Sequence, residues 1–367
     1  MSRVHLTKRR SGDFAVIKRV TFAVPGDLAT PTGGYAYDRR VIAELRMLGW
    51  QVDVLDIGDT FPMPNDIARA TARRKLLATP ARVPLVVDGL ALGVIPEIVA
   101  ELAKTRAIVA LVHHPLALET GVSANEARAL QKSERTALSH ATRIVVTSAA
   151  TAEILIADYG ARKSSITIAM PGHDIVQHAA NDGAVSDGIV RLFAVGSIVP
   201  RKGYDVMIAA LVHLADLPWH LTIAGDRTRD PSTAAALDTA IAGAKLGDRI
   251  TLKGILTDEE LAAEYLNADL FVQASRFEGY GMAAASAIAH GLPIVATDGG
   301  ALGNTVGNSG IIVPADDVPA LALALRKMIS DPVERQRHRA VSQIAARTLQ
   351  SWQTTASQFA SAIEAAT

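Results

Sequence analysis

Cysteine is missing from the sequence, which has 367 residues. Its absence excludes disulfide bonds, thiolate metal sites and cysteine nucleophiles, and it agrees with a reducing, cytoplasmic environment. Long apolar runs are missing too, since none approaches the roughly 18 residues of a membrane-spanning helix. Residues 1–18 are basic but have no apolar segment of the kind that secretory signals carry. We therefore expect a basic N-terminal tail on a cytoplasmic protein.

Neither sign of charge is in excess. Lys and Arg together number 37, as do Asp and Glu, so the composition gives no argument for a nucleic-acid partner, and we expect none. A local concentration of positive charge lies on one predicted helix, with Arg69, Arg73, Arg74 and Lys75. Two interpretations stay open: a solvated helix face, or a patch for peripheral contact with an anionic membrane surface.

Short apolar runs alternate with helical patterns along the whole chain. The chain is too long for one ordinary core, so we expect two packed domains. The predicted strands are Arg19–Pro25, Val52–Ile57, Val83–Val87, Ala107–Val112, Arg143–Thr147 and Ile166–Ala169, then Val190–Val195, His220–Ala224, Arg249–Lys253, Leu270–Ala274, Pro293–Ala296 and Ile311–Val313. Strands of this length with helices between them predict an α/β fold with two Rossmann-like, doubly wound parallel sheets.

A polar stretch separates the two halves. Residues Gln177–Gly188 are small and polar, which is typical of a linker. We predict an N-terminal Rossmann-like domain at residues 19–180 and a C-terminal one at residues 181–350. The pattern of residues 333–366 is helical throughout.

The most informative stretch is Leu270–Pro293, which has the pattern of a strand, a glycine-bearing loop and a helix start. A helix N-terminus offers unpaired N–H groups and partial positive charge, so it suits an anionic ligand. Gly279 and Gly281 remove side chains where a ligand would approach the backbone. Glu278 stands at the mouth of this site and is better suited to binding hydroxyls than phosphate.

Three further loops hold candidate binding residues. The segment Gly196–Gly203 directly follows a predicted strand, and its Arg201 and Lys202 could neutralise a diphosphate, although such a turn can also be simply solvated. Gly33 and Gly34 precede the first helix, but a glycine pair alone is weak evidence. His113-His114-Pro115 closes the strand Ala107–Val112, where an imidazole can donate to a sugar hydroxyl or a phosphate oxygen. A zinc site is not supported, because no third ligand with suitable spacing is visible.

Together these motifs resemble the GT-B glycosyltransferases of family 4, which retain anomeric configuration. The Glu-Gly-aromatic-Gly loop of that family corresponds to Glu278-Gly279-Tyr280-Gly281, and its phosphate-binding lysine to Lys202. The resemblance implies two domains facing across a cleft, a final segment at residues 351–367 that crosses back to the first domain, and catalysis by His113, Lys202 and Glu278. It implies that the nucleotide-sugar is bound by Gly33, Gly34, Gly196, Ser197, Arg201, Lys202, Gly279, Tyr280, Gly281, Met282 and Ser286, without metal or other cofactor.

The resemblance also implies the reaction: transfer of a sugar from a UDP- or GDP-sugar to a glycan, lipid-linked or small-molecule acceptor. Two positions depart from the family pattern. Ser197 stands where the family has an arginine, and Ser286 where it has a second glutamate. A non-catalytic sugar-nucleotide binder and a nucleotide-sugar epimerase on the same fold are therefore alternatives.

Several motifs of other enzyme classes are absent. No Asp-x-Asp occurs, which disfavours the metal-dependent GT-A glycosyltransferases. There is no Gly-x-Gly-x-x-Gly dinucleotide fingerprint, no Walker A sequence and no Gly-x-Ser-x-Gly. The sequence does not decide which of His113 and His114 faces the donor.

Overall fold

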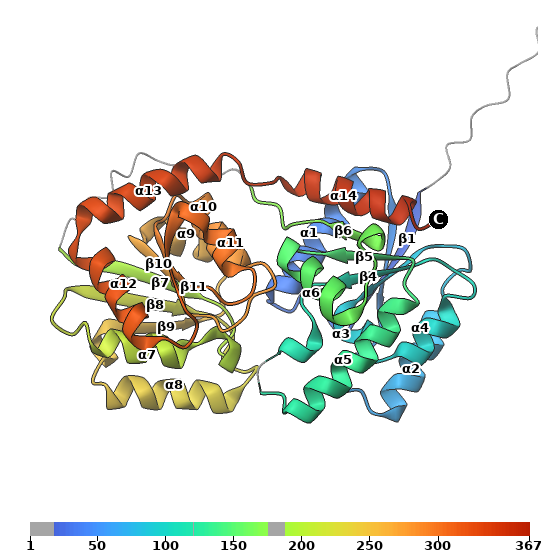
Figure 1. The fold of residues 1–367 in the computed structure, drawn as a ribbon, viewed down its shortest axis with the longest axis horizontal. Helices are drawn as coiled ribbons and strands as arrows, with labels where there is room; N and C mark the ends of the chain where they lie inside the picture. The colour runs from blue at the N-terminus through green and yellow to red at the C-terminus, as the bar shows by residue number, and fades with distance from the viewer. Residues whose placement is uncertain (1–17, 120, 175–187) are drawn as a thin grey trace, which may run out of the picture.

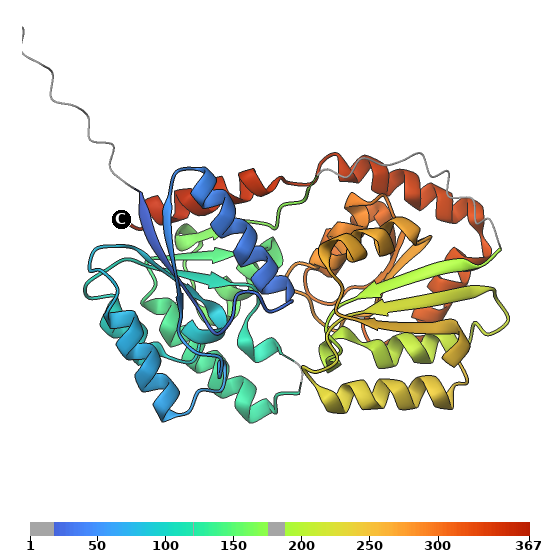
Figure 2. The same ribbon diagram turned by 180° about the vertical axis from the view of Figure 1, so that it is seen from behind.

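A computed structural model describes residues 18–119, 121–174 and 188–367. The chain forms two α/β units that lie side by side along its long axis, each built on a six-stranded sheet (Figures 1 and 2). All pairs of neighbouring strands are parallel. The predicted α/β fold class is confirmed. The predicted tail and the predicted linker fall outside the described residues, apart from Lys18 and Gly188.

The first sheet has the strand order β2-β1-β3-β4-β5-β6. Its strands are β1 (Arg19–Val24), β2 (Gln51–Asp56), β3 (Leu85–Asp88), β4 (Ile108–Val112), β5 (Arg143–Val146) and β6 (Ile166–Ile168). Strands β3 and β4 are buried at every residue, because helices cover both faces of the sheet. This explains why these strands appear in the sequence as continuous apolar runs.

The helices of the first unit form two layers. They are α1 (Gly33–Met47), α2 (Asp66–Leu77), α3 (Gly89–Leu92), α4 (Pro96–Leu102), α5 (Ala124–Ser139) and α6 (Ala149–Tyr159). Apolar residues of α2 to α6 pack on one face of the sheet. Helix α1 packs on the other face together with the C-terminal helix α14 (Trp352–Glu364). Thr32 caps α1, since its side chain accepts a hydrogen bond from the Tyr35 N–H at 3.2 Å.

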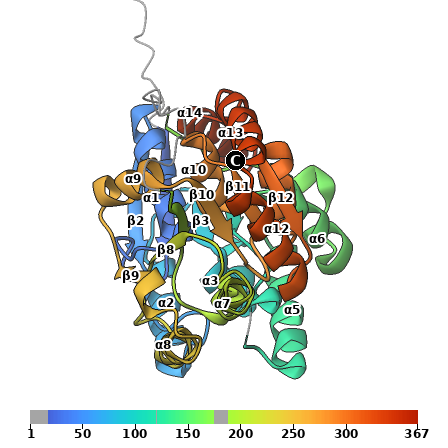
Figure 3. The same ribbon diagram turned by 90° about the vertical axis from the view of Figure 1, so that its left-hand side faces the viewer.

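The second sheet has the order β12-β11-β10-β7-β8-β9. Its strands are β7 (Val190–Val195), β8 (Trp219–Ala224), β9 (Ile250–Gly254), β10 (Leu270–Gln273), β11 (Ile294–Thr297) and β12 (Gly310–Val313). Its helices are α7 (Tyr204–Val212), α8 (Pro231–Gly243), α9 (Asp258–Asn267), α10 (Met282–Ala289), α11 (Leu302–Val306), α12 (Val318–Ser330) and α13 (Pro332–Ala346). Helices α7, α8 and α12 cover one face, and α9, α10 and α11 the other. Figure 3 shows α7 and α8 on the opposite side of the sheet from α9 and α10.

The C-terminal segment is not one continuous helical stretch, so that expectation was wrong. Helix α13 ends at Ala346 and α14 begins at Trp352. Between them, the Gln350 side chain donates to the Met170 carbonyl at 3.0 Å, and the Gln350 carbonyl accepts from the His173 N–H at 2.8 Å. These contacts with a distant segment interrupt the helix, and helical periodicity contains no information about them. Helix α14 then lies along α1 (Figure 1).

Candidate active site

The strand orders place two pairs of loops at the points where each sheet reverses direction. In the second sheet the first strand, β7, lies between β8 and β10, so the loops after β7 and β10 flank the reversal. In the first sheet the same applies to the loops after β1 and β3. Parallel α/β sheets bind ligands in the crevice at this point. The predicted loops Gly196–Gly203 and Ser275–Gly281 lie there, as does the glycine pair, which forms the first two residues of α1 and does not precede the helix as expected.

The two units touch where the loop after β10 meets the end of β4. A Cβ atom on Gly279 would lie 2.1 Å from the His113 carbonyl oxygen. The Thr151 hydroxyl also donates to the Gly279 carbonyl, at 3.3 Å. The position that a side chain at residue 279 would take is therefore filled by the backbone of the first unit, and the approach of a ligand to the Gly279 backbone stays a prediction.

Helix α10 begins beside the glycine pair of the first unit. Gly281 precedes it with φ +96°, a left-handed conformation that favours glycine. Gly33 faces Met282, because a Cβ on Gly33 would lie 3.9 Å from the Met282 Sδ atom. Gly34 faces the ring of His113, with 3.4 Å between a hypothetical Cβ and the His113 Cδ2 atom. The structure thus brings together predicted residues from both units.

Lys202 and Glu278 form an ion pair at the centre of the candidate site residues that the second unit contributes. The Lys202 Nζ atom donates to the Glu278 Oε1 atom at 2.7 Å. The same oxygen accepts from the Ser275 hydroxyl at 2.7 Å and from the Gln273 amide at 2.9 Å. Glu278 is only 8% exposed and lies within this hydrogen-bond network. The prediction that it stands at the mouth of the site was therefore wrong.

Gly196 leaves room for the Lys202 side chain, since a Cβ there would lie 2.9 Å from the Lys202 Cε atom. Burial by itself would raise the pKa of Glu278, but Lys202 and Arg201 outweigh it and lower that pKa to about 2. Glu278 is therefore an anion at neutral pH, and its charge holds the lysine in the loop after β7.

Arg201 connects the two units. Its Nη1 atom donates to the Phe277 carbonyl at 2.7 Å and lies 3.4 Å from the Glu278 Oε2 atom. Its Nε atom donates to Glu119 of the first unit at 3.1 Å, and Glu119 also lies 3.2 Å from the His114 Nε2 atom. Burial by itself would lower the pKa of Arg201, but Glu278 and Glu119 raise it by more than burial lowers it. The guanidinium therefore stays charged.

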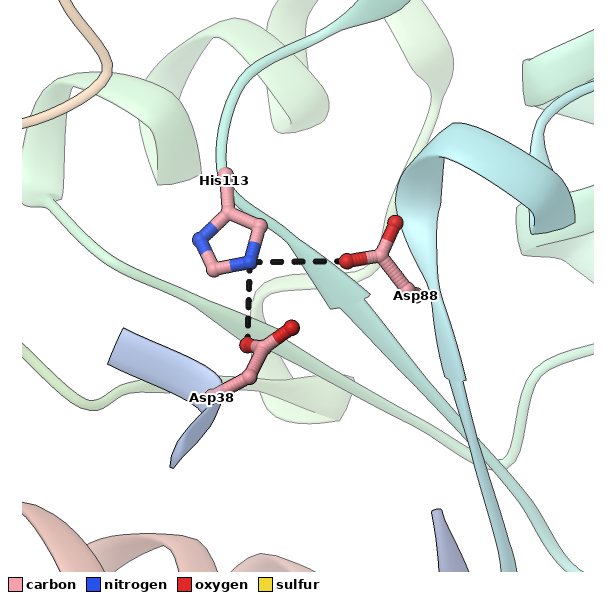
Figure 4. A group of neighbouring side chains, drawn as sticks. All are labelled: Asp38, Asp88 and His113. Atoms are coloured by element: carbon pink, nitrogen blue, oxygen red, sulfur yellow. Dashed lines mark hydrogen bonds and ion pairs between the residues drawn. The ribbon is translucent and has the colours of Figure 1, made fainter. Parts of the chain in front are cut away.

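Two carboxylates contact the same nitrogen of the His113 ring, with Asp38 below the ring and Asp88 beside it in Figure 4. Its Nε2 atom lies 3.2 Å from the Asp38 Oδ1 atom and 3.6 Å from the Asp88 Oδ2 atom. The Asp38 and Asp88 side chains are 0% and 1% exposed. Burial lowers the pKa of His113, but Asp38 and Asp88 raise it by more, so the net direction is upward. Burial also raises the pKa of Asp38, an effect that His113 opposes.

The cluster of Asp38, Asp88 and His113 was not anticipated. One ligand atom from each lies within 4.8 Å of the others, a spacing that suits a small cation as well as an ion-paired triad. Because a protonated imidazole already supplies positive charge to both carboxylates, we interpret the cluster as an ion-paired triad. The expectation that the protein needs no metal stays a prediction.

The remaining predicted residues lie around this centre. Tyr280 is half-buried and stacks on His173 with 6.3 Å between ring centroids. Ser197 is half-buried in the loop after β7. The side chain of Ser286 interacts with the phenol of Tyr265, whose hydroxyl also donates to the Ala283 carbonyl at 3.0 Å. Ser286 therefore points toward α9.

Sequence reasoning missed Asp38, Asp88 and Glu119. Asp88 ends a buried strand at the ligand-binding edge of the sheet, so its position alone could have identified it. Asp38 is a fully buried carboxylate on the apolar face of α1, and an acidic residue at such a position was a usable signal. No sequence signal distinguishes Glu119.

The basic cluster on α2 has partners within the protein. Arg73 pairs with Glu101 at 2.5 Å, Arg69 lies 3.6 Å from Glu97, and Lys75 donates to the Asp56 carbonyl at 2.8 Å. These pairs favour the solvated helix face, and membrane contact stays a prediction. Among the residues that the structure describes, no helix combines the length and apolarity needed to cross a bilayer.

Comparison with known proteins identifies relatives of this arrangement. The family model described as glycosyl transferases group 1 matches residues 190–331. The mannosylfructose-phosphate synthase of Agrobacterium fabrum is 28% identical over 240 residues, which are 61% of this chain and 53% of that protein. A D-inositol 3-phosphate glycosyltransferase of Pseudarthrobacter chlorophenolicus is 30% identical over 233 residues, 60% of this chain and 55% of that protein. The chain thus spans about half the length of these curated relatives.

Solved structures extend the likeness in fold to nearly the whole chain. The sucrose-phosphate synthase of Thermosynechococcus elongatus has a TM-score of 0.80 at 19% identity, covering 93% of this chain and 97% of that one. Anabaena HepE in complex with UDP-glucose has a TM-score of 0.76 at 17% identity, covering 94% and 99%. At such identities the likeness shows the fold, which is GT-B. The chain thus has the fold of the GT-B glycosyltransferases, and its residues 190–331 match the family model of the group 1 glycosyl transferases.

Proposed function

We propose that this protein transfers a sugar from a nucleoside diphosphate sugar, UDP- or GDP-linked, to a hydroxyl acceptor with retention of anomeric configuration and without a metal ion. The observation that carries the proposal is the contact between Lys202 and Glu278 at the reversal point of the second sheet, opposite His113. This contact lies in the segment that matches the group 1 family model. Anabaena HepE, which has the same fold, is in complex with UDP-glucose.

In the proposed reaction the protein acts mainly by electrostatics. Lys202 and the free N–H groups at the start of α10 stabilise the departing diphosphate, whose negative charge grows as the glycosidic bond breaks. Glu278 holds Lys202 in place and binds hydroxyls of the donor sugar. His113 contacts that sugar from the first unit, and the first unit binds the acceptor. No residue is assigned as a covalent nucleophile.

The proposed acceptor is a hydroxyl compound. The curated relatives named above are called after sugar phosphate and inositol phosphate products or acceptors. The chain matches about half of their length, so a glycan, a lipid-linked acceptor and a small polyol all remain candidates.

One alternative has a specific observation in its favour. Ser197 and Ser286 replace charged residues of the family pattern, which would suit a sugar-nucleotide binder without turnover. The comparisons give no support to a nucleotide-sugar epimerase.

The first experiment is a thermal-shift screen against UDP, GDP, ADP and their glucose and mannose conjugates. A ligand that binds only the folded state raises the free energy of unfolding, by about 2.7 kcal/mol when its concentration is a hundred times its Kd. The unfolding temperature rises accordingly. The donor with the largest shift is then incubated with a panel of polyols, sugar phosphates and glycans in EDTA. We expect a new glycoside with the anomeric configuration of the donor, detected by NMR.

Three results would contradict parts of the proposal. An inverted product would remove retention, and a dependence on added Mg²⁺ or Mn²⁺ would remove metal independence. Binding without product across the whole panel would favour the non-catalytic binder.

A further inference from the structure

Helix α1 surrounds the imidazole of His113 with three residues from two successive turns. Gly34 lies against the edge of the ring, with 3.4 Å between a hypothetical Cβ and the Cδ2 atom. Tyr37 meets the ring edge to face, with 5.4 Å between centroids. Asp38 approaches the Nε2 atom to 3.2 Å. Residues four apart on a helix share one face, so Gly34 and Asp38 contact the same ring.

We propose that Asp38 is a positioning residue for His113: it fixes the imidazole with the Nε2–H directed into the first unit, so that the opposite edge of the ring faces the second unit. This inference rests on the proposed function only where it assigns His113 to the donor sugar. The Nε2 atom cannot at once hydrogen-bond Asp38 and reach a donor across the cleft. A contact with the sugar then uses the Nδ1–H or the His113 backbone.

The charges around His113 support this orientation. Asp38 approaches from α1 and Asp88 from the end of β3. From the second unit, the uncharged Gly279 backbone lies against the His113 carbonyl, and Arg229 acts electrostatically on the neighbouring Tyr35. Tyr35 also interacts electrostatically with both aspartates, but its hydroxyl donates to the Pro25 carbonyl. Since both carboxylates approach the Nε2 atom, they favour a proton on that nitrogen and hold that edge of the imidazole toward the first unit.

Asp38 is suited to this role because its side chain contacts the His113 ring directly, beside the carboxyl of Asp88 with which it also interacts. Its side chain is fully buried, and its Oδ1 atom lies 3.2 Å from the His113 Nε2 atom. Asp88, in contrast, also caps α3 by accepting from the Leu90 N–H at 2.8 Å. An ordinary buried residue at position 38 of α1 would be apolar, as Val41, Ile42 and Leu45 are.

The test reads the ring of His113 directly. Histidine labelled with ¹³C and ¹⁵N is incorporated into the full chain, and the His113 signal among the 10 histidines is assigned with His113→Gln. In the wild type we expect ¹⁵N shifts of a ring protonated on Nε2 from pH 6 to pH 8. In Asp38→Asn we expect the midpoint of His113 titration to fall by about one pH unit or more. The control is Asp53→Asn, whose aspartate pairs with Arg19 on the far edge of the same sheet.

A second measurement links orientation to turnover, with hydrolysis of UDP-glucose as the probe reaction. Asp38→Asn is expected to lower kcat by about ten- to a hundredfold while KM changes by less than about threefold. A purely structural role would lower the unfolding temperature without changing the His113 shifts. If the wild type neither binds nor hydrolyses UDP-glucose, UDP-glucose is not the donor. The NMR signals of His113 still test the proposed orientation of its ring in that case.

Two results would overturn the inference. The first is a neutral, Nδ1-protonated His113 in the wild type at pH 7, which needs no variant and so does not depend on Asp38→Asn folding. The second is a stoichiometric metal ion in the purified protein whose removal by EDTA changes the His113 shifts, because a cation would then hold the ring.

Discussion

Lys202 and Glu278 are 76 positions apart in the sequence, yet the Lys202 Nζ atom donates to the Glu278 Oε1 atom at 2.7 Å. Both side chains are largely buried, at 15% and 10% exposure. The positive charge that the proposed mechanism needs for a diphosphate is therefore already paired within the protein. A donor has to compete with Glu278 for this lysine or share it, which couples recognition of the phosphates to recognition of the sugar.

The first prediction concerns Lys202. In Lys202→Ala a charge-assisted hydrogen bond to the diphosphate is lost, worth roughly 1.5–3 kcal/mol. We expect kcat/KM to fall by about ten- to a hundredfold. The control is Lys253→Ala, which removes a lysine paired with Glu264 on the same unit and should leave turnover unchanged. A change below about twofold for Lys202→Ala would move the phosphate-binding role to Arg201.

The second prediction separates the two roles of Glu278. In Glu278→Gln the carboxylate charge that pairs with Lys202 is lost, so the lysine becomes available to a diphosphate, while Arg201 keeps its contact with Glu119. We expect UDP or GDP to bind at least as tightly as to the wild type, while sugar transfer falls by tenfold or more, roughly the loss of a charged hydrogen bond. Calorimetry with the nucleotide alone measures the first quantity and product formation the second. A collapse of nucleotide affinity would show that the assignment of Glu278 to the sugar is wrong.

The third prediction concerns the contact between the two units. An alanine at Gly279 would place its Cβ 2.1 Å from the His113 carbonyl oxygen, and backbone on both sides leaves little room to adjust. We expect Gly279→Ala to cost about 1–3 kcal/mol through overpacking and to abolish most of the activity. Gly243→Ala is the matched control, since no neighbouring atom lies within 4 Å of a Cβ there. Equal unfolding temperatures and activities for the two variants would contradict the prediction.

The fourth prediction concerns pH and Glu134, which accepts a hydrogen bond from the Leu116 N–H at 3.0 Å. Burial raises the pKa of Glu134 from 4.5 to about 8. The folded state therefore holds this proton more tightly than the unfolded state does. The resulting stability is complete below pH 4.5 and is lost as the pH rises through about 8.

Glu134→Gln keeps the shape of the side chain without the ionisation. We expect the variant and the wild type to unfold at similar temperatures at pH 5, and the variant to be more stable at pH 9, on the order of 5 kcal/mol. Thermal unfolding monitored by circular dichroism measures both. The exposed Glu153 on α6 provides the control variant, and an equal response of Glu153→Gln would remove burial as the cause.

The fifth prediction concerns Ser286, which points toward Tyr265. A glutamate at this position is expected to add a charged hydrogen bond to the ribose of the donor. We expect Ser286→Glu to bind the cognate nucleotide more tightly by about 1–2 kcal/mol. Calorimetric titration of both proteins gives the difference. Unchanged or weaker binding would mean that the pocket is built around the serine and Tyr265.

The sequence by itself determined the layered α/β architecture and the loops that lie at the reversal points of the two sheets. Buried parallel strands are short apolar runs, and the loops after them are polar or glycine-rich, so both are visible in a single sequence. Lys202 and Glu278 could be selected because each lies in a loop directly after a predicted strand. Local patterns were enough for these assignments, since each depends on neighbours within a few residues.

Only the tertiary structure decided which side chains meet. Three contacts of the site join residues that are 75 or more positions apart in the sequence. They are the pairs Lys202 and Glu278, Glu119 and Arg201, and Asp38 and His113. The reason for glycine at position 279 is the carbonyl of His113 in the other unit, and the break before α14 follows from contacts with residues 170–173. Such contacts depend on the order of strands in the two sheets and on how the units pack, and neither hydrophobic periodicity nor local propensity encodes them.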